Sequence, residues 1–295
     1  MGGATPPLAT RQAPAAENAA APWAFAVLMA VYAGERPEYL EQALESLCAS
    51  RIPVQELVLV EDGPLTQALS AVIEQYRARL PIHSVVLSRN GGLGPALTAG
   101  LHACRSPWVA RFDTDDLIEP DRFERQIAWL QAHPEVGLCG GWISEFDRDP
   151  QVVGAQPLRR VPQTHDEIVA YARRRNPFNH MTVMFRKDAA LAAGAYADEP
   201  LYEDYALWVR MLQQGTQMAN LPCVLVRARA GGGMFARRGG WKYVRSEYAM
   251  QRTFLRSGFI GPLRFMANLA LRLPVRLAPT GLRKLIYQRL LRHSH

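Results

Sequence analysis

Short apolar runs recur along the first half of the chain, and amphipathic stretches separate them. The runs span residues 25–32, 57–60, 84–87 and 108–112. Runs of this length are typical of buried strands. After the first run Pro37 can open a helix, and Leu40, Leu44 and Leu47 then repeat with helical spacing. Strand and helix alternate, which predicts the α/β fold class, with a mostly parallel sheet flanked by helices on both faces.

The pattern changes after about residue 136. Residues 136–146 predict an irregular strand, and residues 181–185 alternate like an antiparallel strand. Residues 205–212 have helical spacing that Gly215 ends, and residues 224–226 predict a last strand. No clear linker separates the halves, so we expect the second half to extend the same sheet into a mixed one.

Three carboxylates follow the fourth apolar run directly, at Asp113, Asp115 and Asp116. In an open α/β sheet, ligands bind just beyond the carboxyl ends of the strands. Adjacent like charges raise one another's pKa, so a positive group is expected beside them. A hard divalent cation with oxygen ligands is the simplest candidate.

This acidic cluster has other interpretations. It is also typical of a solvated turn, or of an N-cap in which Asp115 or Asp116 begins a helix near Pro120. A calcium-binding loop is excluded, because Ile118 occupies the position where that loop requires glycine. A phosphatase of the haloacid type is disfavoured, because the threonine expected just after the second carboxylate is missing.

Polar groups also follow the three other strands predicted in the first half. Tyr32 ends the first, Glu61 and Asp62 follow the second, and residues 90–94 follow the third. Since the carboxyl ends of parallel strands lie along one edge, we expect these groups to meet the acidic cluster. Asp62 is suited to accept hydrogen bonds from a nucleotide base or ribose, or to act as a turn residue before Gly63.

The glycine-rich loop of residues 90–94 leads into a predicted helix. Its backbone N–H groups, from Asn90 to Gly94, are suited to approach an anion. The loop does not match the dinucleotide-binding pattern, because Leu97 stands in place of the third glycine, and it lacks the lysine of a P-loop. The alternative is a tight turn that allows close helix packing.

Glu203 and Asp204 form a second acidic pair at the start of the helix predicted over residues 205–212. A carboxylate there is suited to act as a general base. Acids are also favoured in the first turn of any helix by its dipole. His180 is a candidate for the lining of the pocket, although a lone histidine is more often structural.

A basic run that contains Arg237, Arg238 and Trp241 follows a glycine-rich segment. Its guanidinium groups are suited to stabilise a diphosphate. The alternative is a solvated loop.

Composition and charge narrow the class of protein. The chain has 295 residues and a net charge of +7. Residues 248–295 hold nine Lys or Arg and no acid, whereas the other 247 residues hold 25 basic and 27 acidic side chains. The body of the protein is not basic, which argues against nucleic acid as a partner. No apolar stretch predicts a membrane-spanning helix, and the first 22 residues predict a disordered leader without a signal peptide.

The basic charge belongs to an amphipathic tail. Over residues 252–292, arginines are interleaved with Phe, Leu and Ile. Such segments suit an anionic membrane surface. The alternative is a pair of C-terminal helices that packs on the protein itself.

Taken in order, these motifs resemble the family 2 glycosyltransferases, inverting enzymes with the nucleotide-diphospho-sugar transferase (GT-A) fold. The matching segments are Val31-Tyr32, Glu61-Asp62-Gly63, the loop from Asn90 to Gly94, the cluster from Asp113 to Asp116, and Glu203-Asp204. Residues 179–186 and 237–242 resemble a subgroup for bacterial exopolysaccharide, such as the amylovoran biosynthesis proteins. The resemblance spans roughly residues 24–250.

The resemblance implies a role for each acid of the first half. Asp62 would hold the base or ribose of a nucleotide-sugar donor. Asp113 and Asp115 would form the D-x-D pair that contacts the nucleotide and a Mn²⁺ or Mg²⁺ ion, with Asp115 the main metal ligand. Asp116 would line the sugar pocket.

The resemblance also implies the reaction. Asp204, with Glu203 beside it, would be the catalytic base that activates a hydroxyl of a glycan or polyprenyl-linked acceptor, with UDP as the carrier of the donor sugar. Processive members carry Q-x-x-R-W after the base, and residues 237–241 do not match it. The family's membrane-spanning helices are also absent. We therefore expect addition of one sugar by a protein that is peripheral on the cytoplasmic face of the inner membrane.

The expected organisation is a leader (1–22), a GT-A domain (23–250) and a basic amphipathic segment (251–295). Two other functions stay open. A sugar-1-phosphate nucleotidyltransferase would use a related sheet, but residues 32–36 lack its G-x-G-x-R loop. A catalytically inactive nucleotide-sugar-binding protein is the other alternative.

Overall fold

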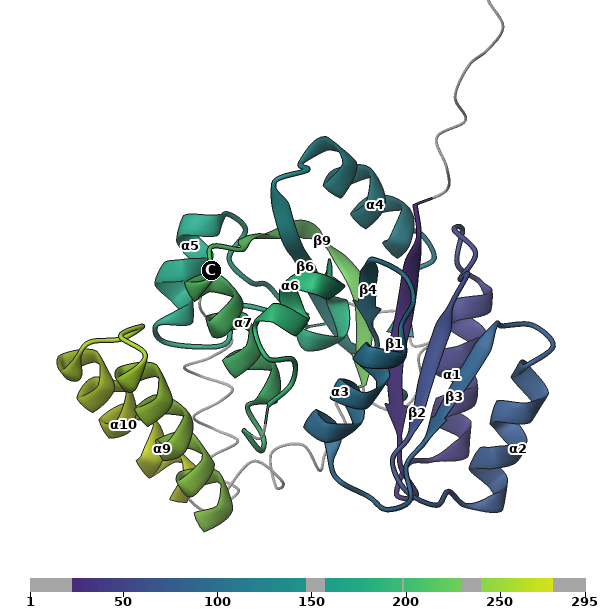
Figure 1. Ribbon diagram of the computed structural model, residues 1–295, viewed down its shortest axis with the longest axis horizontal. Helices are drawn as coiled ribbons and strands as arrows, with labels where there is room; N and C mark the ends of the chain where they lie inside the picture. The colour runs from purple at the N-terminus through teal and green to yellow at the C-terminus, as the bar shows by residue number, and fades with distance from the viewer. Residues whose placement is uncertain (1–22, 147–156, 198, 230–239, 278–295) are drawn as a thin grey trace, which may run out of the picture.

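The computed structural model describes residues 23–146, 157–197, 199–229 and 240–277. Its first half alternates strand and helix, as the sequence predicts (Figure 1). The strands are β1 (Phe25–Val31), β2 (Leu57–Glu61), β3 (Ile82–Val86) and β4 (Trp108–Arg111). The helices are α1 (Pro37–Cys48), α2 (Gln67–Tyr76) and α3 (Leu93–Ala103).

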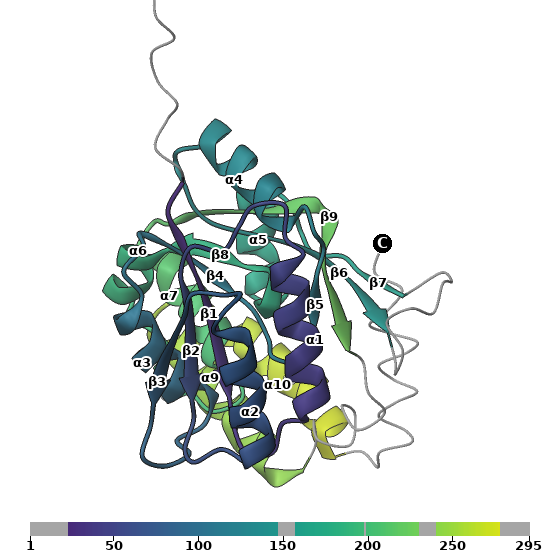
Figure 2. The same cartoon turned by 90° about the vertical axis from the view of Figure 1, so that its right-hand side faces the viewer.

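These four strands lie in the order β3-β2-β1-β4, and each neighbouring pair is parallel. Successive side chains of a strand point to opposite faces. Val27 and Met29 of β1 accordingly pack in one core with α1 and α2, whereas Ala26 and Leu28 pack in another with α3. Figure 2 shows α1 and α2 together on one face of this part of the sheet. The predicted arrangement of helices on both faces is confirmed.

The second half extends the sheet beyond β4. Its strands follow in the order β8 (Met184–Arg186), β6 (Val136–Phe146), β9 (Gln217–Arg229) and β5 (Leu117–Ile118), and β7 (Leu158–Arg159) pairs with β6. β8 is antiparallel to β4 and β6, whereas β9 is parallel to β6. Its helices are α4 (Arg122–Ala132), α5 (His165–Ala172), α6 (Lys187–Ala192) and α7 (Glu203–Gln213). The sheet is therefore mixed, as predicted.

In the second half, two strands differ from their predicted limits. The strand predicted over residues 181–185 begins only at Met184, because the 3₁₀ turn η1 (His180–Thr182) precedes it. The strand predicted over residues 224–226 is the second part of the much longer β9. Proline in an apolar run argues against a continuous strand, and Pro222 lies where the register between β6 and β9 shifts. An irregularity of the pairing accommodates it.

Helices α9 (Trp241–Arg256) and α10 (Pro262–Leu277) form a hairpin at the outer edge of the molecule (Figure 1). Phe254 and Ile260 are buried with Tyr205 and Val209 of α7 in one apolar cluster. Between residues 240 and 277, the tail thus packs on the protein itself, and the expected boundary after residue 250 falls inside α9. Within the described ranges, no helix combines the length and apolarity needed to cross a membrane.

Candidate functional site

The carboxyl ends of β1, β2, β3 and β4 lie along one edge of the sheet, as expected. Val31 at the end of β1 pairs with Glu61 at the end of β2, and Glu61 pairs with Val86 of β3. Tyr32 follows β1 with 42% of its surface exposed. The groups predicted after each strand are therefore brought together at this edge.

Asp62 holds the loop that follows β3. Its Oδ1 accepts a hydrogen bond from the backbone N–H of Gly91 (2.7 Å), and its Oδ2 accepts one from Gly92 (3.0 Å). The Asn90 side chain donates to the carbonyl oxygen of Asp62 (3.2 Å). Asp62 is buried, so these bonds form away from bulk water. Asp62 thus positions the glycine-rich loop, and its contact with a nucleotide stays a prediction.

Gly94 lies where two helices of the site meet. A Cβ added at Gly94 would lie 3.4 Å from the Cβ of Glu203, which opens α7. This is an ordinary contact distance, so the first turn of α3 lies against Glu203. The predicted approach of the loop to an anion stays a prediction.

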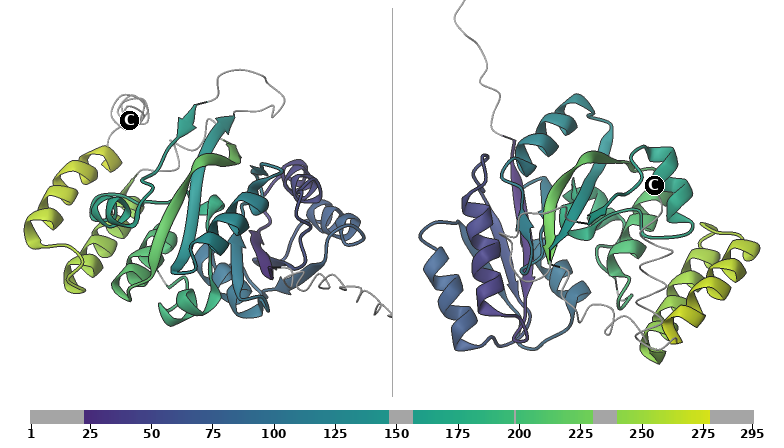
Figure 3. Two further views of the ribbon diagram at one scale, coloured as in Figure 1. Left: turned by 90° about the horizontal axis from the view of Figure 1, so that it is seen from above. Right: turned by 180° about the vertical axis from the view of Figure 1, so that it is seen from behind.

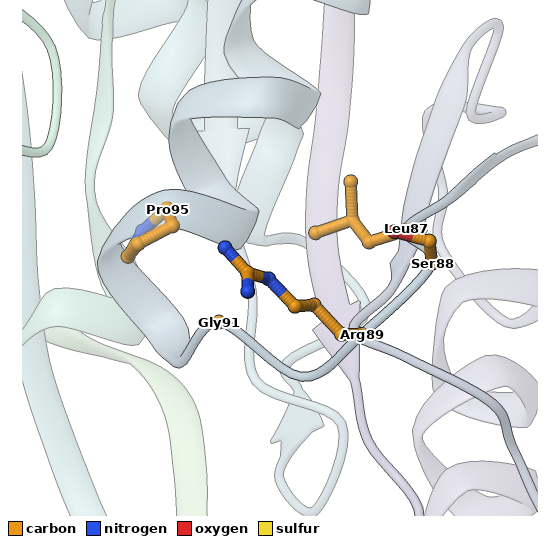
Figure 4. A pocket seen from close by; sticks show the side chains of 5 residues that line it. All are labelled: Leu87, Ser88, Arg89, Gly91 and Pro95. Atoms are coloured by element: carbon orange, nitrogen blue, oxygen red, sulfur yellow. The ribbon is translucent and has the colours of Figure 1, made fainter.

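An open hollow of about 630 Å³ lies on the outer side of the same loop. Leu87, Ser88, Arg89, Gly91 and Pro95 line it (Figure 4). The hollow is just beyond β3, beside the start of α3, and the acids of the cluster do not line it. It adjoins the loop that Asp62 holds and is separate from the acidic cluster.

A buried arginine lies under the acidic cluster. Arg111 is 1% exposed at the end of β4, and it forms an ion pair with Asp113 and donates to the carbonyl oxygen of Phe112. Arg122 of α4 is also buried and donates to the carbonyl oxygen of Arg111 (2.8 Å). Burial lowers the pKa of Arg122 to about 9. Arg111 is the only charged residue in the fourth apolar run, and it is the cation that pairs with Asp113.

Arg229, at the end of β9, forms hydrogen bonds with Asp115 and Asp116, the other two acids of the cluster. Its backbone N–H donates to Oδ1 of Asp116 (2.7 Å), and its Nε donates to the carbonyl oxygen of Asp115 (3.0 Å). Its guanidinium also lies over the ring of Tyr39 and donates to Gln42 of α1 (2.6 Å). The helix near Pro120 begins at Arg122, so neither Asp115 nor Asp116 is its N-cap.

The cluster carries negative charge that the protein only partly compensates. Burial, followed by the charge of Asp113, raises the pKa of Asp115 to about 6. Burial and the neighbouring Asp115 raise the pKa of Asp116 well above its ordinary value. Oδ2 of Asp116 is buried without a protein hydrogen-bond partner. Oxygen atoms that lack compensation in this way fit a hard cation.

The geometry limits how such a cation is held. Among the described residues, no group of three or more His, Cys, Asp and Glu is arranged to hold a metal ion. Mg²⁺-type sites with one or two carboxylates are usual where a substrate phosphate supplies the other oxygens. The acidic cluster by itself therefore does not complete a metal site, and the assignment of Asp115 and Asp113 as metal ligands stays a prediction.

Glu203 and Asp204 open α7, where an Asn orients one of them. Oδ2 of Asp204 accepts from the Asn176 side chain (2.6 Å), and its Oδ1 accepts from the backbone N–H of Tyr205 (2.7 Å). Burial raises the pKa of Asp204, and these two hydrogen bonds oppose the rise. Burial and the charge of Asp204 raise the pKa of Glu203 to about 7. Nothing in the sequence marked Asn176 as the orienting group.

The two acidic groups act on one another across the site. Besides burial, the charge of Asp113 contributes to the raised pKa of Asp204. Asp204, Glu203 and Asp113 all add to the raised pKa of buried Tyr196. The strand-end acids and the acids of α7 therefore converge on one region.

His180 belongs to an aromatic cluster. Its Nε2 lies 3.1 Å from the hydroxyl of Tyr196, and its ring contacts Trp208 edge to face. Burial lowers its pKa well below the ordinary value, which favours the neutral ring. The structure thus shows a histidine packed against Tyr196 and Trp208, and its contact with a ligand stays a prediction.

The last predicted contacts concern the basic run. Arg237 and Arg238 lie outside the described residues. Trp241 is the first residue of α9 and is 68% exposed. Their predicted contacts with a diphosphate stay predictions.

Comparison with known proteins gives consistent matches. Residues 26–191 match the model of the family described as "Glycosyl transferase family 2". The chain is 43% identical over 269 residues to the amylovoran biosynthesis glycosyltransferase AmsE of Erwinia amylovora, covering 90% of this chain and 98% of that protein. It is 37% identical over 268 residues to the UDP-Gal:alpha-D-GlcNAc-diphosphoundecaprenol beta-1,3-galactosyltransferase of Escherichia coli, covering 91% and 96%.

Solved structures show the same fold at low identity. S. aureus TarS 1-349 in complex with UDP-GlcNAc has a TM-score of 0.60 and 17% identity, with 85% of this chain and 72% of that chain covered. The mannosyltransferase PcManGT from Pyrobaculum calidifontis, in complex with GDP-Man and Mn²⁺, also has a TM-score of 0.60 and 17% identity, with 90% and 75% covered. The chain therefore shares its overall fold with these proteins.

Proposed function

The chain belongs to glycosyl transferase family 2 and has the GT-A fold, and from this premise we propose that it moves one sugar from a UDP-sugar to a hydroxyl of a lipid-linked glycan. The observation that carries the proposal is the convergence of the strand-end acids with Glu203 and Asp204. The name of the E. coli relative, which includes both UDP-Gal and a diphosphoundecaprenol acceptor, supports the choice of donor and acceptor.

The strand-end acids serve the donor side. Asp115 and Asp113 would hold Mn²⁺ or Mg²⁺ together with the donor diphosphate, and Asp116 would face the sugar. When bound, the ion supplies positive charge that stabilises the leaving diphosphate. Arg229 and Arg111 fix the position of the cluster. Arg229 donates hydrogen bonds to Asp116 and to the backbone oxygen of Asp115, and Arg111 pairs with Asp113.

Asp204 serves the acceptor side as general base. It takes the proton of the acceptor hydroxyl, and the oxygen forms a bond to the anomeric carbon. The bond from that carbon to the diphosphate oxygen breaks on the opposite face, and the nucleoside diphosphate leaves with the electron pair. The configuration is inverted. Asn176 orients Asp204 for this step, in the way that a third group orients the base of a catalytic triad.

The acceptor also sets where the protein works. A glycan carried on a polyprenyl lipid stays in the membrane, and a nucleotide sugar is supplied from the cytoplasm. We therefore place the protein at the cytoplasmic face of the inner membrane, in the synthesis of an exopolysaccharide or another surface glycan. The name of the E. amylovora relative supports this pathway class.

A screen of sugar nucleotides for release of nucleoside diphosphate in the presence of Mn²⁺ tests the proposal. We expect one UDP-sugar to be turned over, and Asp204→Asn to lower kcat by about 100-fold or more. Asp188→Asn is the matched control, because Asp188 also accepts from the next backbone N–H (2.7 Å) but lies exposed on α6. An Asp204→Asn variant within a few-fold of wild type would remove Asp204 from its role.

The same screen separates the other candidate functions. Release of pyrophosphate in place of a nucleoside diphosphate would identify a nucleotidyltransferase. Absence of turnover with every sugar nucleotide, despite donor binding, would identify an inactive binding protein.

A further inference from the structure

The polar side of helix α10 faces the protein, and its apolar side faces the solvent. Asn268, Arg272 and Arg276 recur every four residues and face the protein interior, where they hydrogen-bond the buried side chains of Gln251, Glu247 and Tyr202. Every exposed residue of α10 is apolar. A surface helix normally turns its polar side to water. α10 does the opposite, so its outer side requires an apolar environment.

The apolar face of α10 consists chiefly of Leu263, Met266, Leu271 and Leu277. These side chains are 87%, 62%, 73% and 48% exposed. They span the whole helix, from its second residue to its last. Scattered exposed apolar residues are ordinary, whereas a contiguous face of this kind marks an interaction surface.

The neighbouring helix supplies the charge that selects the partner. Lys242, Arg245, Arg252 and Arg256 are exposed along α9 and form its basic stripe. Glu247 is the only acid between residues 240 and 277, and it is fully buried. The surface of the hairpin is thus basic and apolar, without one exposed carboxylate.

Two aromatic side chains complete the surface. Trp241 and Tyr248 of α9 are 68% and 45% exposed. Trp and Tyr favour the boundary between lipid headgroups and acyl chains. Figure 3 shows the hairpin at the edge of the molecule, away from the sheet. We propose that the hairpin docks on an anionic bilayer, with the apolar face of α10 inserted at the headgroup boundary and the basic stripe of α9 against the lipid phosphates.

Vesicle co-sedimentation of the full-length protein tests this proposal, separately from catalysis. Vesicles with about 30% phosphatidylglycerol should bind the protein at low salt, and pure phosphatidylcholine vesicles should bind it at least ten-fold less. The variant Leu263→Gln/Met266→Gln/Leu271→Gln should lose at least ten-fold in binding, with an unchanged Tm. Arg252→Gln/Arg256→Gln should lose about as much, at about five-fold per residue.

Matched controls are exposed apolar residues elsewhere. Val86→Gln and Leu158→Gln, at positions 68% and 50% exposed, should leave vesicle binding unchanged. Three results would overturn the proposal: no binding of the full-length protein to anionic vesicles, equal binding by the triple variant, or conversion of a dimer to a monomer by that variant. The last result would assign the apolar face of α10 to a second copy of the chain. A lower Tm of the triple variant is a fourth such result, and it would assign the apolar face to another segment of this chain.

A different observation concerns the inner side of the hairpin. Buried Glu247 of α9 accepts a hydrogen bond from the hydroxyl of Tyr202 (2.6 Å), and Arg272 and Arg276 of α10 neutralise it. Arg276 also donates to the Tyr202 hydroxyl (2.9 Å). Tyr202 directly precedes Glu203 and is the N-cap residue of α7. The hairpin therefore holds the start of the helix that carries the proposed base.

The hairpin also holds the partner of that base. Asn268 donates to the carbonyl oxygen of Arg173 (3.0 Å), and Arg272 donates to that of Arg174. These carbonyls lie just before Asn176, which donates to Asp204. We infer that Tyr202 and Glu247 are positioning residues, which keep the hydrogen bond between Asn176 and Asp204 in register.

This inference rests on the proposed role of Asp204, and the variant Tyr202→Phe tests it. We expect kcat to fall by about 5- to 20-fold while KM for the donor stays within about two-fold, because the donor site is left intact. Loss of the hydrogen bond from Asn176 should also move the acid limb of the kcat profile to higher pH. The charged and titratable groups that act on Asp204 are Glu203, Asp113, Arg159 and Tyr196, and none of them is changed.

Tyr76→Phe is the matched control. Buried Tyr76 donates to Glu45 (2.8 Å), and Arg79 neutralises Glu45, so the same chemistry is removed on α2. Tyr76→Phe should lower the Tm less, because Glu45 is 54% exposed and Glu247 is fully buried, and only Tyr202→Phe should change kcat and its pH profile. If Tyr202→Phe folds poorly, Arg276→Met gives the same comparison, because it removes the donor to the Tyr202 hydroxyl and leaves Arg272 to neutralise Glu247. Unchanged kcat and pH profile in these variants would leave the network a purely structural role and refute the inference, whereas a fully active Asp204→Asn would refute the proposed base.

Discussion

Glu203 and Asp204 stand side by side at the start of α7, but different groups surround their carboxylates. Asp204 accepts hydrogen bonds from Asn176 and from the N–H of Tyr205, which favour its charged form. For Glu203, burial and the charge of Asp204 dominate, and its pKa rises to about 7. The hydrogen bonds to Asp204 thus favour the form that can accept a proton, whereas Glu203 is partly protonated near neutral pH.

The raised pKa of Glu203 predicts a pH dependence of stability. A folded-state pKa of about 7, above the ordinary 4.5, makes the native state bind the proton more tightly. Stability therefore falls as pH rises from about 4.5 to about 7, by at most about 3 kcal/mol. Glu203→Gln should remove this loss, so its Tm should exceed that of wild type by several degrees at pH 8 and by less at pH 5. Thermal unfolding at both pH values measures the difference.

Glu167 provides a control of opposite sign. Backbone hydrogen bonds from Thr164 and Gln163 lower the pKa of its carboxyl in the capping box of α5. Glu167→Gln should therefore lower the Tm slightly at pH 8. A Glu203→Gln variant that is destabilised equally at both pH values would contradict the assigned environment of Glu203.

At the scale of the elements, two turns at the edge of the sheet depend on each other. The turn after β2 supplies Asp62, which binds the N–H groups of the loop after β3. Gly63 has φ +85°, and a Cβ added there would lie 2.6 Å from the backbone nitrogen of Asn90. Asp62 therefore holds the loop by hydrogen bonds, and the absence of a Cβ at Gly63 leaves room for the backbone of Asn90.

Gly63→Ala should disrupt this contact. The left-handed conformation costs a non-glycine residue about 1–2 kcal/mol, and the clash with the backbone of Asn90 adds about 1–3 kcal/mol. Gly92→Ala is the matched control, since Gly92 has φ +89° but open space around an added Cβ. The Tm of Gly63→Ala should fall roughly twice as far as that of Gly92→Ala, and KM for the donor should rise only in the former. Equal effects of the two substitutions would show that crowding between the turns is unimportant.

At the scale of the molecule, the hairpin of α9 and α10 belongs to the folded body. Met250, Phe254 and Ile260 complete an apolar cluster with Tyr205 and Val209 of α7. Buried Glu247, which Arg272 and Arg276 of α10 neutralise, also accepts a hydrogen bond from Tyr202 at the start of α7. Deletion of the tail from residue 252 is therefore not a neutral test of membrane binding, because it removes part of this core.

Truncation after residue 239 should destabilise the whole protein. Burial of each large apolar side chain of the hairpin contributes about 2–5 kcal/mol, and three such side chains are lost. We expect the Tm to fall by at least about 10 °C, or the protein to aggregate, as measured by thermal unfolding and light scattering. Removal of residues 1–22, which the sequence predicts to be a leader, is the control and should leave the Tm unchanged. A truncated protein with a normal Tm would make the hairpin an independent appendage.

Local sequence patterns predicted much of the secondary structure of this protein. The alternation of apolar runs and helical spacing predicted β1 to β4 with α1 to α3, because the period of a strand or helix is a property of consecutive residues. The placement of Asp113, Asp115 and Asp116 at a strand end followed from the same pattern. The full extent of β9 did not, because Pro222 breaks the apolar run and only pairing with β6 compensates for it.

The tertiary structure alone decided the partners of the buried charges. Asp116 meets Arg229 across 113 positions of the chain, and Glu247 meets Tyr202 across 45. No local period encodes such pairs, because a buried carboxylate is stabilised by whichever donor the fold brings within about 3 Å. The sequence by itself determined the edge of the sheet where the acids gather, whereas only the fold decided that Asp62 holds a loop, that Asn176 orients Asp204, and that α10 turns its charges inward.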